Sequence, residues 1–404
     1  MHLTLLTQYY PPEIGAPQAR LSELAAHFVS RGHSVTVLTA MPNYPKGKIH
    51  AGYGGVLLRE KQNGANVIRT FIYPTQKVNL APRMANYLSF VLSSSIVGST
   101  QLKQTDYLLV ESPPLFLGLA AVWLSALKRA RMIFNVSDLW PESAVRLGVL
   151  KEDSLAFRLS AKLESYCYQR AWLVTGQSKA ILADINDRFP HCSTFHLSNG
   201  VDTSKFSPKR STDRTRALLT QDRRLVVLYA GLHGVAQGLD QALEAAEAVQ
   251  DLNVQFVLIG DGPEKEALVR RARERQLKNV RFLDAVSAQE MPPIIASADI
   301  ILVPLKTYIP GAVPSKLYEA MASERPVMLV ADGEAADTVR AYDAGLAVKP
   351  GNITGLVEAL RALSSQPEAR KRMGANGRRA TELFFDRAQI VGGFIRHLEA
   401  HLCH

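Results

Sequence analysis

Short apolar runs recur along the whole chain and alternate with segments of helical periodicity. In the first half the runs lie at His2–Thr7, Ser34–Thr39, Val67–Phe71, Tyr107–Val110, Met132–Val136 and Trp172–Gly176. In the second half they lie at Leu225–Ala230, Val254–Gly260, Val280–Leu283, Ile300–Val303, Val327–Val330 and Ala347–Lys349. Such runs, separated by helices, are typical of parallel strands buried on both faces. The pattern predicts an α/β protein with two doubly wound parallel sheets.

The length of 404 residues fits two domains of roughly 150 to 200 residues each. We place the N-terminal domain at residues 1–200 and the second domain at 201–385, and we expect a C-terminal helix at 386–404 to join the first domain. The polar stretch Ser204–Arg224 is predicted to start the second half and to form a surface loop. Because ligands of such sheets bind beyond the carboxyl ends of the strands, we expect two Rossmann-like domains that face each other across a cleft.

Composition indicates a folded protein with reduced thiols. Hydrophobic residues make up 47% of the chain and charged residues 21%, which excludes a disordered chain. The cysteines, Cys167, Cys192 and Cys403, show no metal-ligand spacing and no even pairing, so we expect a cytosolic protein. The N-terminus reads MHLTLLTQYYPP and lacks a basic region before its apolar run, which favours a first strand over a signal peptide.

The net charge of +10 calls for an anionic partner. Nucleic acid is disfavoured because the basic residues are scattered and aromatic residues reach only 7%. No apolar run reaches the roughly 18 residues that a membrane-spanning helix needs. The segment Pro82–Lys103 is an apolar helix candidate with Arg83 near its start and Lys103 at its end. Two interpretations remain open: a helix lying on an anionic membrane surface, or a core helix of the α/β domain.

A loop that leads into a helix at Gly311–Ala322 carries the clearest chemistry. It contains Lys316 and Glu319 at the mouth of the helix. Backbone N–H groups and the positive end of the helix dipole favour anions there, and the lysine adds a full positive charge. The glutamate can accept hydrogen bonds from two sugar hydroxyls. Together these groups suggest a nucleotide-sugar as ligand.

Five segments, taken in their order and spacing, resemble a known family. They are QYYPPEIGAPQARLSELAAHFVSRGHSVTVLT, NVSDLWPES, LSNGVDTSKFSP, LYAGLHGVAQGLD followed by LIGDGPEKEAL, and PSKLYEAMASERPV. They resemble retaining GT-B glycosyltransferases of the family-four class, in particular bacterial fucosyl and N-acetylfucosaminyl transferases of capsule, O-antigen and colanic acid assembly. The resemblance covers nearly the whole chain and implies an N-terminal acceptor-binding domain and a C-terminal donor-binding domain.

In the N-terminal domain the resemblance singles out two residues. Gly15, in the loop before the predicted helix Ala19–Ser30, would face the diphosphate of the donor. Asp138, at the end of the strand Met132–Val136, would touch the donor sugar. The residues alone also allow Asp138 to cap a helix that begins near Leu139, and both roles can hold at once.

In the C-terminal domain the resemblance implies that the loop holding Gly231, His233 and Gln237 faces the diphosphate. Most relatives carry an Arg and a Lys in this loop, whereas here those places hold Leu232 or His233 and Gln237. We expect Lys316 to supply the missing charge, because a diphosphate needs a nearby cation. Further donor-binding candidates are Asp261, in the turn after the next strand, and Val286, where the family binds the nucleobase through the backbone.

The last segment departs from the family at one position. Relatives commonly have two glutamates separated by seven residues; the second is Glu319, which would hold the ribose hydroxyls, but the first position holds Gly311. The missing glutamate is compatible with a deoxy sugar, which offers fewer hydroxyls. Pro314, Ser315 and Leu317 complete the set expected to bind the nucleotide.

The resemblance implies transfer of a glycosyl group, with retention, from a nucleoside-diphosphate sugar to a polyprenyl-diphosphate-linked saccharide. Asp138, Lys316 and Glu319 are the expected catalytic residues. A UDP-linked donor with a fucose-type or N-acetylated 6-deoxy sugar is favoured. The absence of an Asp-x-Asp motif predicts that neither a metal ion nor another cofactor is needed. We expect a cytoplasmic protein, peripheral on the inner face of the cytoplasmic membrane. A GT-B nucleotide-sugar 2-epimerase and a non-catalytic nucleotide-sugar-binding subunit remain alternatives.

Overall fold

The computed structural model describes residues 1–44, 46–76, 80–146 and 148–402. The chain forms two compact units: unit 1 comprises Met1–Ser198 and Ile390–His404, and unit 2 comprises Asn199–Gln389. Cys167 and Cys192 are both free thiols. The third predicted thiol, Cys403, lies outside the described residues.

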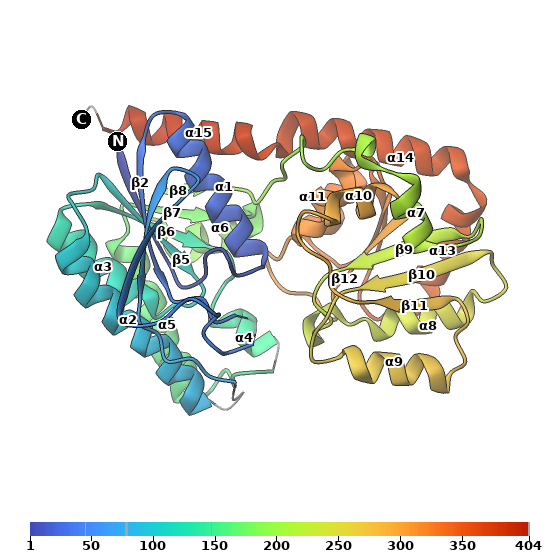
Figure 1. The fold of residues 1–404 in the computed structure, drawn as a ribbon, viewed down its shortest axis with the longest axis horizontal. Helices are drawn as coiled ribbons and strands as arrows, with labels where there is room; N and C mark the ends of the chain where they lie inside the picture. The colour runs from blue at the N-terminus through green and yellow to red at the C-terminus, as the bar shows by residue number, and fades with distance from the viewer. Residues whose placement is uncertain (45, 77–79, 147, 403–404) are drawn as a thin grey trace. The chain divides into compact units, whose positions relative to one another are not determined.

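Unit 1 is built on an eight-stranded sheet with the order β3-β4-β2-β1-β5-β6-β7-β8 (Figure 1). All neighbouring strands are parallel except β3 and β4, which pair antiparallel at one edge. The strands are β1 (His2–Thr7), β2 (Ser34–Ala40), β3 (Leu57–Gln62), β4 (Ala65–Thr70), β5 (Tyr107–Ser112), β6 (Arg131–Val136), β7 (Leu173–Gly176) and β8 (Thr194–His196).

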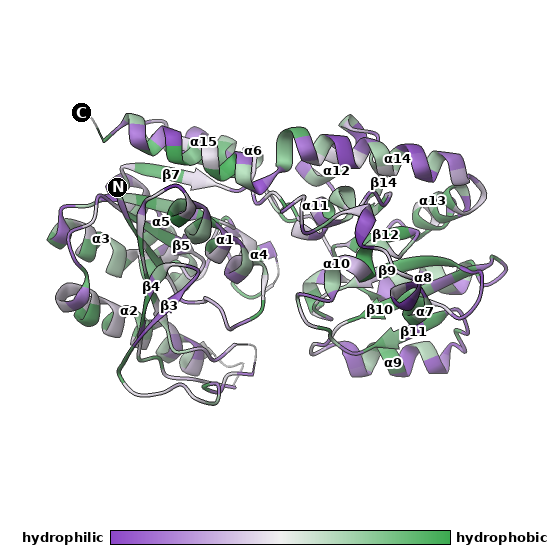
Figure 2. Ribbon diagram, turned by 45° about the horizontal axis from the view of Figure 1, so that its top comes forward, coloured by the Kyte–Doolittle hydropathy of each residue, from purple (hydrophilic) through white to green (hydrophobic). Residues whose placement is uncertain are grey.

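Unit 2 is built on a six-stranded, fully parallel sheet with the order β11-β10-β9-β12-β13-β14. Its strands are β9 (Leu225–Ala230), β10 (Val254–Ile259), β11 (Val280–Leu283), β12 (Ile300–Pro304), β13 (Val327–Val330) and β14 (Gly345–Val348). The hydrophobic colour runs along the strands of both sheets in Figure 2. The prediction of two doubly wound parallel-sheet units is confirmed.

Helices cover both faces of the sheet in unit 1. One face packs on α2 (Leu80–Gln101), α3 (Leu117–Lys128), α5 (Leu155–Arg170) and α6 (Lys179–Arg188). The other face packs on α1 (Ala16–Ser30) and on α15 (Arg387–Ala400), whose buried residues from Val391 onward join this core. A short helix, α4 (Glu142–Arg146), follows β6.

Unit 2 has the same layered construction. One face of its sheet packs on α7 (Asp213–Leu219), α10 (Met291–Ala296), α11 (Ser315–Ala322) and α12 (Glu334–Ala341). The other face packs on α8 (Asp240–Ala248), α9 (Lys265–Glu274), α13 (Ile353–Ser365) and the start of α14 (Pro367–Ala380). A 3-10 turn at Val235–Gln237 follows β9, a second at Pro208–Arg210 precedes α7, and a π-helical turn at Thr381–Phe385 links α14 to α15.

Each of the twelve predicted strands overlaps an observed one, but two observed strands are absent from the prediction. β3 reads LLREKQ and its residues alternate between exposed and half-buried, because it lies at an open edge of the sheet. β8 has only three residues, all half-buried. Neither segment has the continuous apolar run that marks a central parallel strand.

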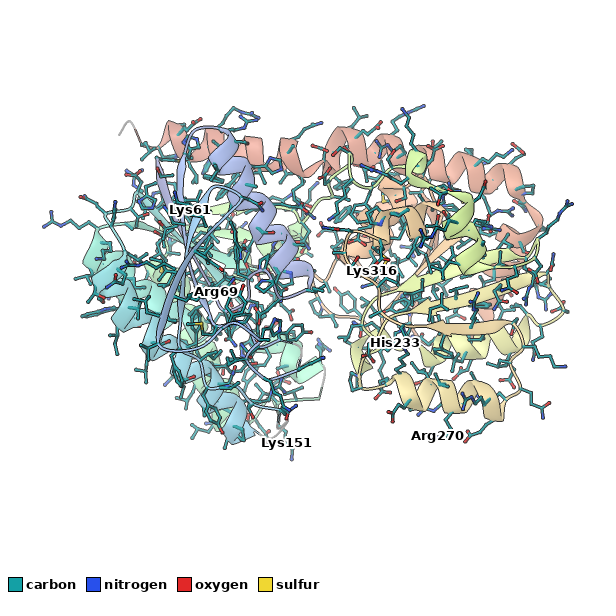
Figure 3. The ribbon with its side chains drawn as sticks, in the orientation of Figure 1. Lys61, Arg69, Lys151, His233, Arg270 and Lys316 are labelled. Atoms are coloured by element: carbon teal, nitrogen blue, oxygen red, sulfur yellow. The ribbon has the colours of Figure 1, made fainter. Side chains whose placement is uncertain are left out.

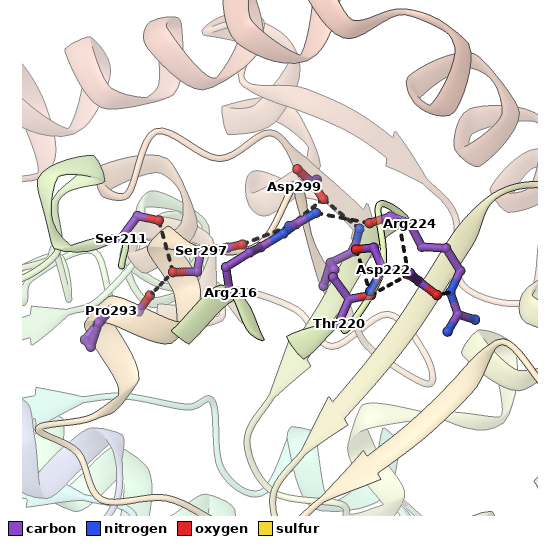
Figure 4. Close-up of polar contacts among 9 residues, drawn as sticks. Ser211, Arg216, Thr220, Asp222, Arg224, Pro293, Ser297 and Asp299 are labelled. Atoms are coloured by element: carbon purple, nitrogen blue, oxygen red, sulfur yellow. Dashed lines mark hydrogen bonds and ion pairs between the residues drawn. The ribbon is translucent and has the colours of Figure 1, made fainter. Parts of the chain in front are cut away.

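The segment Ser204–Arg224, predicted as a surface loop, contains a helix. α7 begins with a capping box in which Thr212 and Thr215 satisfy each other's backbone N–H groups. Arg216 on this helix forms an ion pair with Asp299 at 2.7 Å, and Asp299 also accepts the backbone N–H of Val226 at 2.7 Å. These contacts tie α7 to the start of β9 (Figure 4). The prediction was wrong because polar capping residues resemble loop residues in composition.

The apolar segment that forms α2 is buried on one face and exposed on the other. Phe90 is fully buried and Val91 nearly so, whereas Leu88, Leu92 and Ile96 are exposed. One face of α2 therefore belongs to the core of unit 1, and the opposite face carries large apolar side chains to the surface. Among the described residues, no helix combines the length and hydropathy required to cross a membrane.

Candidate functional site

The site in unit 2 begins where β9 ends at Ala230. The next residue, Gly231, has φ of +150°, and a Cβ placed there would lie 2.6 Å from Nζ of Lys316. Glycine is therefore required for this approach. The Lys316 ammonium also lies 5.7 Å from the centre of the Tyr229 ring, which is close enough for a cation–π contact. The first turn of α11 thus brings a lysine to the loop after β9, as Figure 3 shows.

Lys316 is poorly satisfied within the protein. Its ammonium group forms no hydrogen bond and no ion pair with any residue that the structure describes. Burial lowers the pKa of Lys316, and the negative charge of Glu319, one turn further along α11, partly opposes the shift. Because an ammonium group has three donors, this position favours an anionic ligand with several acceptor oxygens.

His233 is the second unsatisfied group at this edge. Its side chain is fully buried, and within the described chain neither ring nitrogen has a hydrogen-bond partner of good geometry. Burial and the nearby charge of Lys265 lower the pKa of His233 to about 4, against the opposing effects of Asp261 and the Ile259 carbonyl. The imidazole is therefore neutral at pH 7 and keeps one donor and one acceptor.

Two further glycines allow the loops after β9 and β10 to pack backbone against backbone. Gly260 and Gly262 have φ of +148° and +153°. A Cβ on Gly260 would overlap the carbonyl oxygen of Gly231, and one on Gly262 would lie 2.5 Å from the carbonyl oxygen of His233. The exposed Asp261 between them accepts the backbone N–H of His233 at 2.8 Å through its carbonyl. The turn at Gly260–Gly262 therefore holds His233 in place.

The other predicted donor-binding residues lie around these groups with different exposure. Gln237 ends the 3-10 turn, and its buried Oε1 has no partner within the described residues. Pro314 and Ser315 form the start of α11. Val286 is partly buried against the core. Leu317 is fully buried in the core cluster of unit 2, and its N–H donates to the Pro314 carbonyl at 3.0 Å.

In unit 1, Gly15 and Asp138 follow β1 and β6 respectively. Gly15 lies at the N-cap of α1 with extended backbone, and the Gln18 side chain folds over it, so that a Cβ would lie 3.1 Å from Cδ of Gln18. Burial raises the pKa of Asp138, while the Ser143 hydroxyl and the Leu139 N–H oppose the shift.

The expected helix near Asp138 begins later than predicted. α4 starts at Glu142, four residues after Asp138, so the helix beginning near Leu139 is corrected to one beginning at Glu142. Pro141 directly precedes this helix and cannot donate a backbone hydrogen bond. Glu142 itself is half-buried, and burial together with the charge of Asp184 raises its pKa.

Sequence reasoning missed a buried polar group close to Asp138. Glu111, in β5, accepts hydrogen bonds from Arg20, from Asn135 at 2.5 Å and from Ser137 at 2.5 Å. Thr175 in β7 donates to Asn135 at 2.7 Å and extends this group, which we call the Glu111 network. The signal in the sequence is a set of polar residues at the ends of β5, β6 and β7, three neighbouring strands.

The described residues contain no group of three or more His, Cys, Asp or Glu side chains that could hold a metal ion.

Each unit matches the model of a known protein family. Residues 15–191 match the model of the glycosyl transferase 4-like domain, and residues 211–380 match that of glycosyl transferases group 1. The chain belongs to the group 1 glycosyltransferases. The match to group 1 spans all the unit 2 residues that surround Lys316.

Relatives of this group 1 glycosyltransferase include two bacterial proteins. It is 24% identical to "Putative colanic acid biosynthesis glycosyl transferase WcaI" of Escherichia coli K12, over 96% of this chain and 97% of that protein. It is 29% identical to "Probable glycosyltransferase WbjE" of Pseudomonas aeruginosa, over 50% of this chain and 51% of that protein. The specific resemblance to fucosyl and N-acetylfucosaminyl transferases remains a prediction.

Solved structures show the same GT-B fold. Sucrose-phosphate synthase of Thermosynechococcus elongatus superimposes with a TM-score of 0.77 at 18% identity, covering 99% of both chains. Anabaena Alr3699/HepE in complex with UDP-glucose superimposes with a TM-score of 0.73 at 15% identity, covering 99% of this chain and 100% of HepE.

Proposed function

We propose that this group 1 glycosyltransferase transfers a sugar, with retention, from a UDP-linked donor to a lipid-linked saccharide in cell-surface polysaccharide biosynthesis. The observation that carries the proposal is the unsatisfied Lys316 ammonium against Gly231, beside the buried His233. The bound UDP-glucose of HepE supports a UDP donor, and the name of WcaI supports a role in polysaccharide assembly. The transferred sugar is of the fucose or N-acetylated 6-deoxy type.

Departure of the nucleoside diphosphate is the hard step, and the chain supplies positive charge for it. Lys316 and the N–H groups at the start of α11 would stabilise the negative charge that grows on the leaving phosphate. Glu319 would accept hydrogen bonds from the ribose hydroxyls, and Asp138 would contact the transferred sugar. Because Lys316 provides this charge, the transfer is proposed to need no metal ion.

The reaction balances without an enzymic nucleophile. The bond between the anomeric carbon and the diphosphate oxygen breaks, and the acceptor hydroxyl oxygen bonds to the same carbon from the same face. The hydroxyl proton passes to the departing phosphate oxygen. This sequence of events retains the anomeric configuration and releases a nucleoside diphosphate.

Thermal shift with UDP-, GDP- and dTDP-sugars tests the donor, since a ligand bound only by the native state raises apparent stability. Incubation of the stabilising donor with a lipid-linked acceptor should then release nucleoside diphosphate and lengthen the glycolipid, in the presence or absence of a chelator. An isomerised sugar nucleotide would instead indicate an epimerase. Donor binding with neither product would indicate a non-catalytic subunit.

Asp138→Asn separates chemistry from folding. The amide keeps the size of the carboxylate and removes its charge, so we expect transfer to fall at least about tenfold, the lower end for loss of one charged transition-state contact. The melting temperature should change little. Full activity per folded molecule would make Asp138 a structural residue.

We also propose that the protein acts in the cytoplasm, as a peripheral protein on the inner face of the cytoplasmic membrane, where a polyprenyl-diphosphate-linked acceptor would lie. The net charge of +10 and the exposed apolar residues of α2 support this location.

A further inference from the structure

Two neighbouring helices of unit 1 carry matching stripes of large apolar side chains on their outer faces. On α2 the stripe is Leu88, Leu92 and Ile96, with exposed fractions of 40%, 63% and 68%. Residues spaced by four lie one above another on a helix, so the three form a continuous row. This row is distinct from the buried face of α2 that contains Phe90.

The second stripe lies on α3. It consists of Leu119, Trp123 and Leu127, with exposed fractions of 42%, 57% and 49%, and it has the same spacing of four. A soluble surface does not require six large apolar residues in two aligned rows. We call the two stripes together the apolar face.

Specific contacts hold the two stripes side by side. A Cβ on Gly98 would lie 2.8 Å from a methyl carbon of Leu124, so the glycine lets α3 approach α2 closely. Nε1 of Trp123 donates to the Ser99 hydroxyl at 3.0 Å, and Nζ of Lys128 donates to the Ser99 carbonyl at 2.7 Å. The apolar face is therefore a preformed surface.

The third helix of this layer extends the face and adds charge. α5 carries two exposed leucines, Leu155 and Leu159, with exposed fractions of 69% and 57%. The exposed Arg158 lies between them in the sequence, and the exposed Lys162 follows them. α3 and α5 are neighbours that pack on the same face of the sheet.

The charges of these three helices all have one sign at the surface. Their exposed charged residues are Arg83, Arg158, Lys162 and Arg170, followed by Arg129 at the C-cap of α3. The single acid within the described residues of α2, α3 and α5 is Glu164, which is 2% exposed and forms an ion pair with Arg188 at 2.8 Å. Glu152 and Asp153 lie in the loop before α5.

We infer that the apolar face, with the basic residues of α5, is the surface by which this protein lies on an anionic lipid bilayer. Apolar side chains would enter the boundary between headgroups and acyl chains while arginine and lysine contact lipid phosphates. A second copy of the chain fits less well, because two such faces would bring like charges together. The inference rests on the proposed membrane location and names the residues responsible.

Vesicle binding without donor or acceptor tests the inference apart from catalysis. The protein should sediment with vesicles containing phosphatidylglycerol at about 0.05 M salt, bind phosphatidylcholine vesicles far less, and be partly released at about 0.5 M salt. Trp123 should shift its fluorescence to shorter wavelength on binding, and Trp123→Phe should abolish most of that shift. A shift of equal size in Trp123→Phe would overturn the assignment.

The double variant Leu92→Ser/Leu127→Ser should weaken partition into anionic vesicles at least about tenfold, or about 1.4 kcal/mol in total, because two leucine side chains no longer enter the bilayer. Both residues are exposed, so its thermal stability and its donor-induced thermal shift should match the native protein. The matched control is Leu383→Ser, a 58% exposed leucine of unit 2, which should bind vesicles normally.

Three further outcomes would overturn the inference. Unchanged vesicle binding by the double variant would place the contact elsewhere. Equal binding to neutral and anionic vesicles at all salt concentrations would show that the basic residues do not contribute to binding. A native dimer in light scattering that the double variant converts to monomer would make the apolar face a protein interface. None of these measurements uses glycosyl transfer. A negative result would therefore not contradict the proposed reaction, which the release of nucleoside diphosphate tests separately.

Discussion

Two buried polar side chains, Glu111 near the end of β5 in unit 1 and His233 after β9 in unit 2, differ in how far the described residues satisfy them. In unit 1 the buried carboxylate of Glu111 receives hydrogen bonds from Arg20, Asn135 and Ser137. In unit 2 the ring nitrogens of His233 have no well-placed partner among the described residues, and Lys316 has no ion pair there. Buried polar groups normally find partners, so His233 and Lys316, which meet at the end of β9, are the groups that we propose contact the ligand.

The contrast also separates stability from function. A satisfied network orders the backbone around it, because the polar groups have one low-energy arrangement. Unsatisfied groups cost stability until a ligand completes them. We therefore expect substitutions in the Glu111 network to affect folding, and those at Lys316 to affect binding.

Removing Glu111 should have the largest effect. Glu111→Ala leaves the buried guanidinium of Arg20 without its carboxylate, and breaking such a pair costs about 3 to 5 kcal/mol. All three tryptophans, Trp123, Trp140 and Trp172, belong to unit 1, so intrinsic fluorescence during urea unfolding reports this loss. The control is Glu399→Ala. The half-exposed carboxylate of Glu399 pairs with His33, and its removal should lower the free energy of unfolding by less than about 1 kcal/mol. Equal losses in both variants would contradict the contrast.

Lys316→Ala should have the next largest effect, on UDP binding. Loss of hydrogen bonds to a charged group should weaken UDP by about 1.5 to 3 kcal/mol, measured by calorimetry. The free protein should melt at an unchanged or higher temperature, because the variant removes a buried charge without an internal partner. Lys349→Ala, at an exposed lysine of unit 2, is the matched control and should bind UDP normally. Normal affinity in Lys316→Ala would show that the diphosphate is held elsewhere.

The strands and the loop of Lys316 could be predicted from the sequence because their signals are local. A buried parallel strand is a continuous apolar run, and a glycine-containing loop before a helix indicates an anion site. The short edge strand β8 and the capped helix α7 lack such signals and were missed.

The sequence shows polar residues at the ends of β5, β6 and β7, but their association in the Glu111 network could not be predicted because the members lie far apart in the sequence. Arg20 and Glu111 are separated by 91 positions, and only the adjacency of β1 and β5 brings their segments together. No periodicity encodes that adjacency. The same limit applies to the apolar face, where a helix could be recognised at α2 but its exposed row could not be separated from Phe90.

The smallest expected effect concerns the response of unit 2 to acid. His233 is the single histidine within Asn199–Gln389, and its pKa is lowered from 6.5 to about 4. Between these values the unfolded chain binds a proton that the folded chain does not, so stability falls as the pH drops from about 6.5 to about 4. His233→Phe removes the titrating group and should reduce the acid-induced loss by about 1 to 2 kcal/mol. Calorimetric unfolding of both proteins at several pH values gives the dependence of the unfolding free energy on pH for each. If the free energy of unfolding changes equally with pH in both proteins, His233 is hydrated or paired in solution. Lys316 would then be the remaining unsatisfied group of this site.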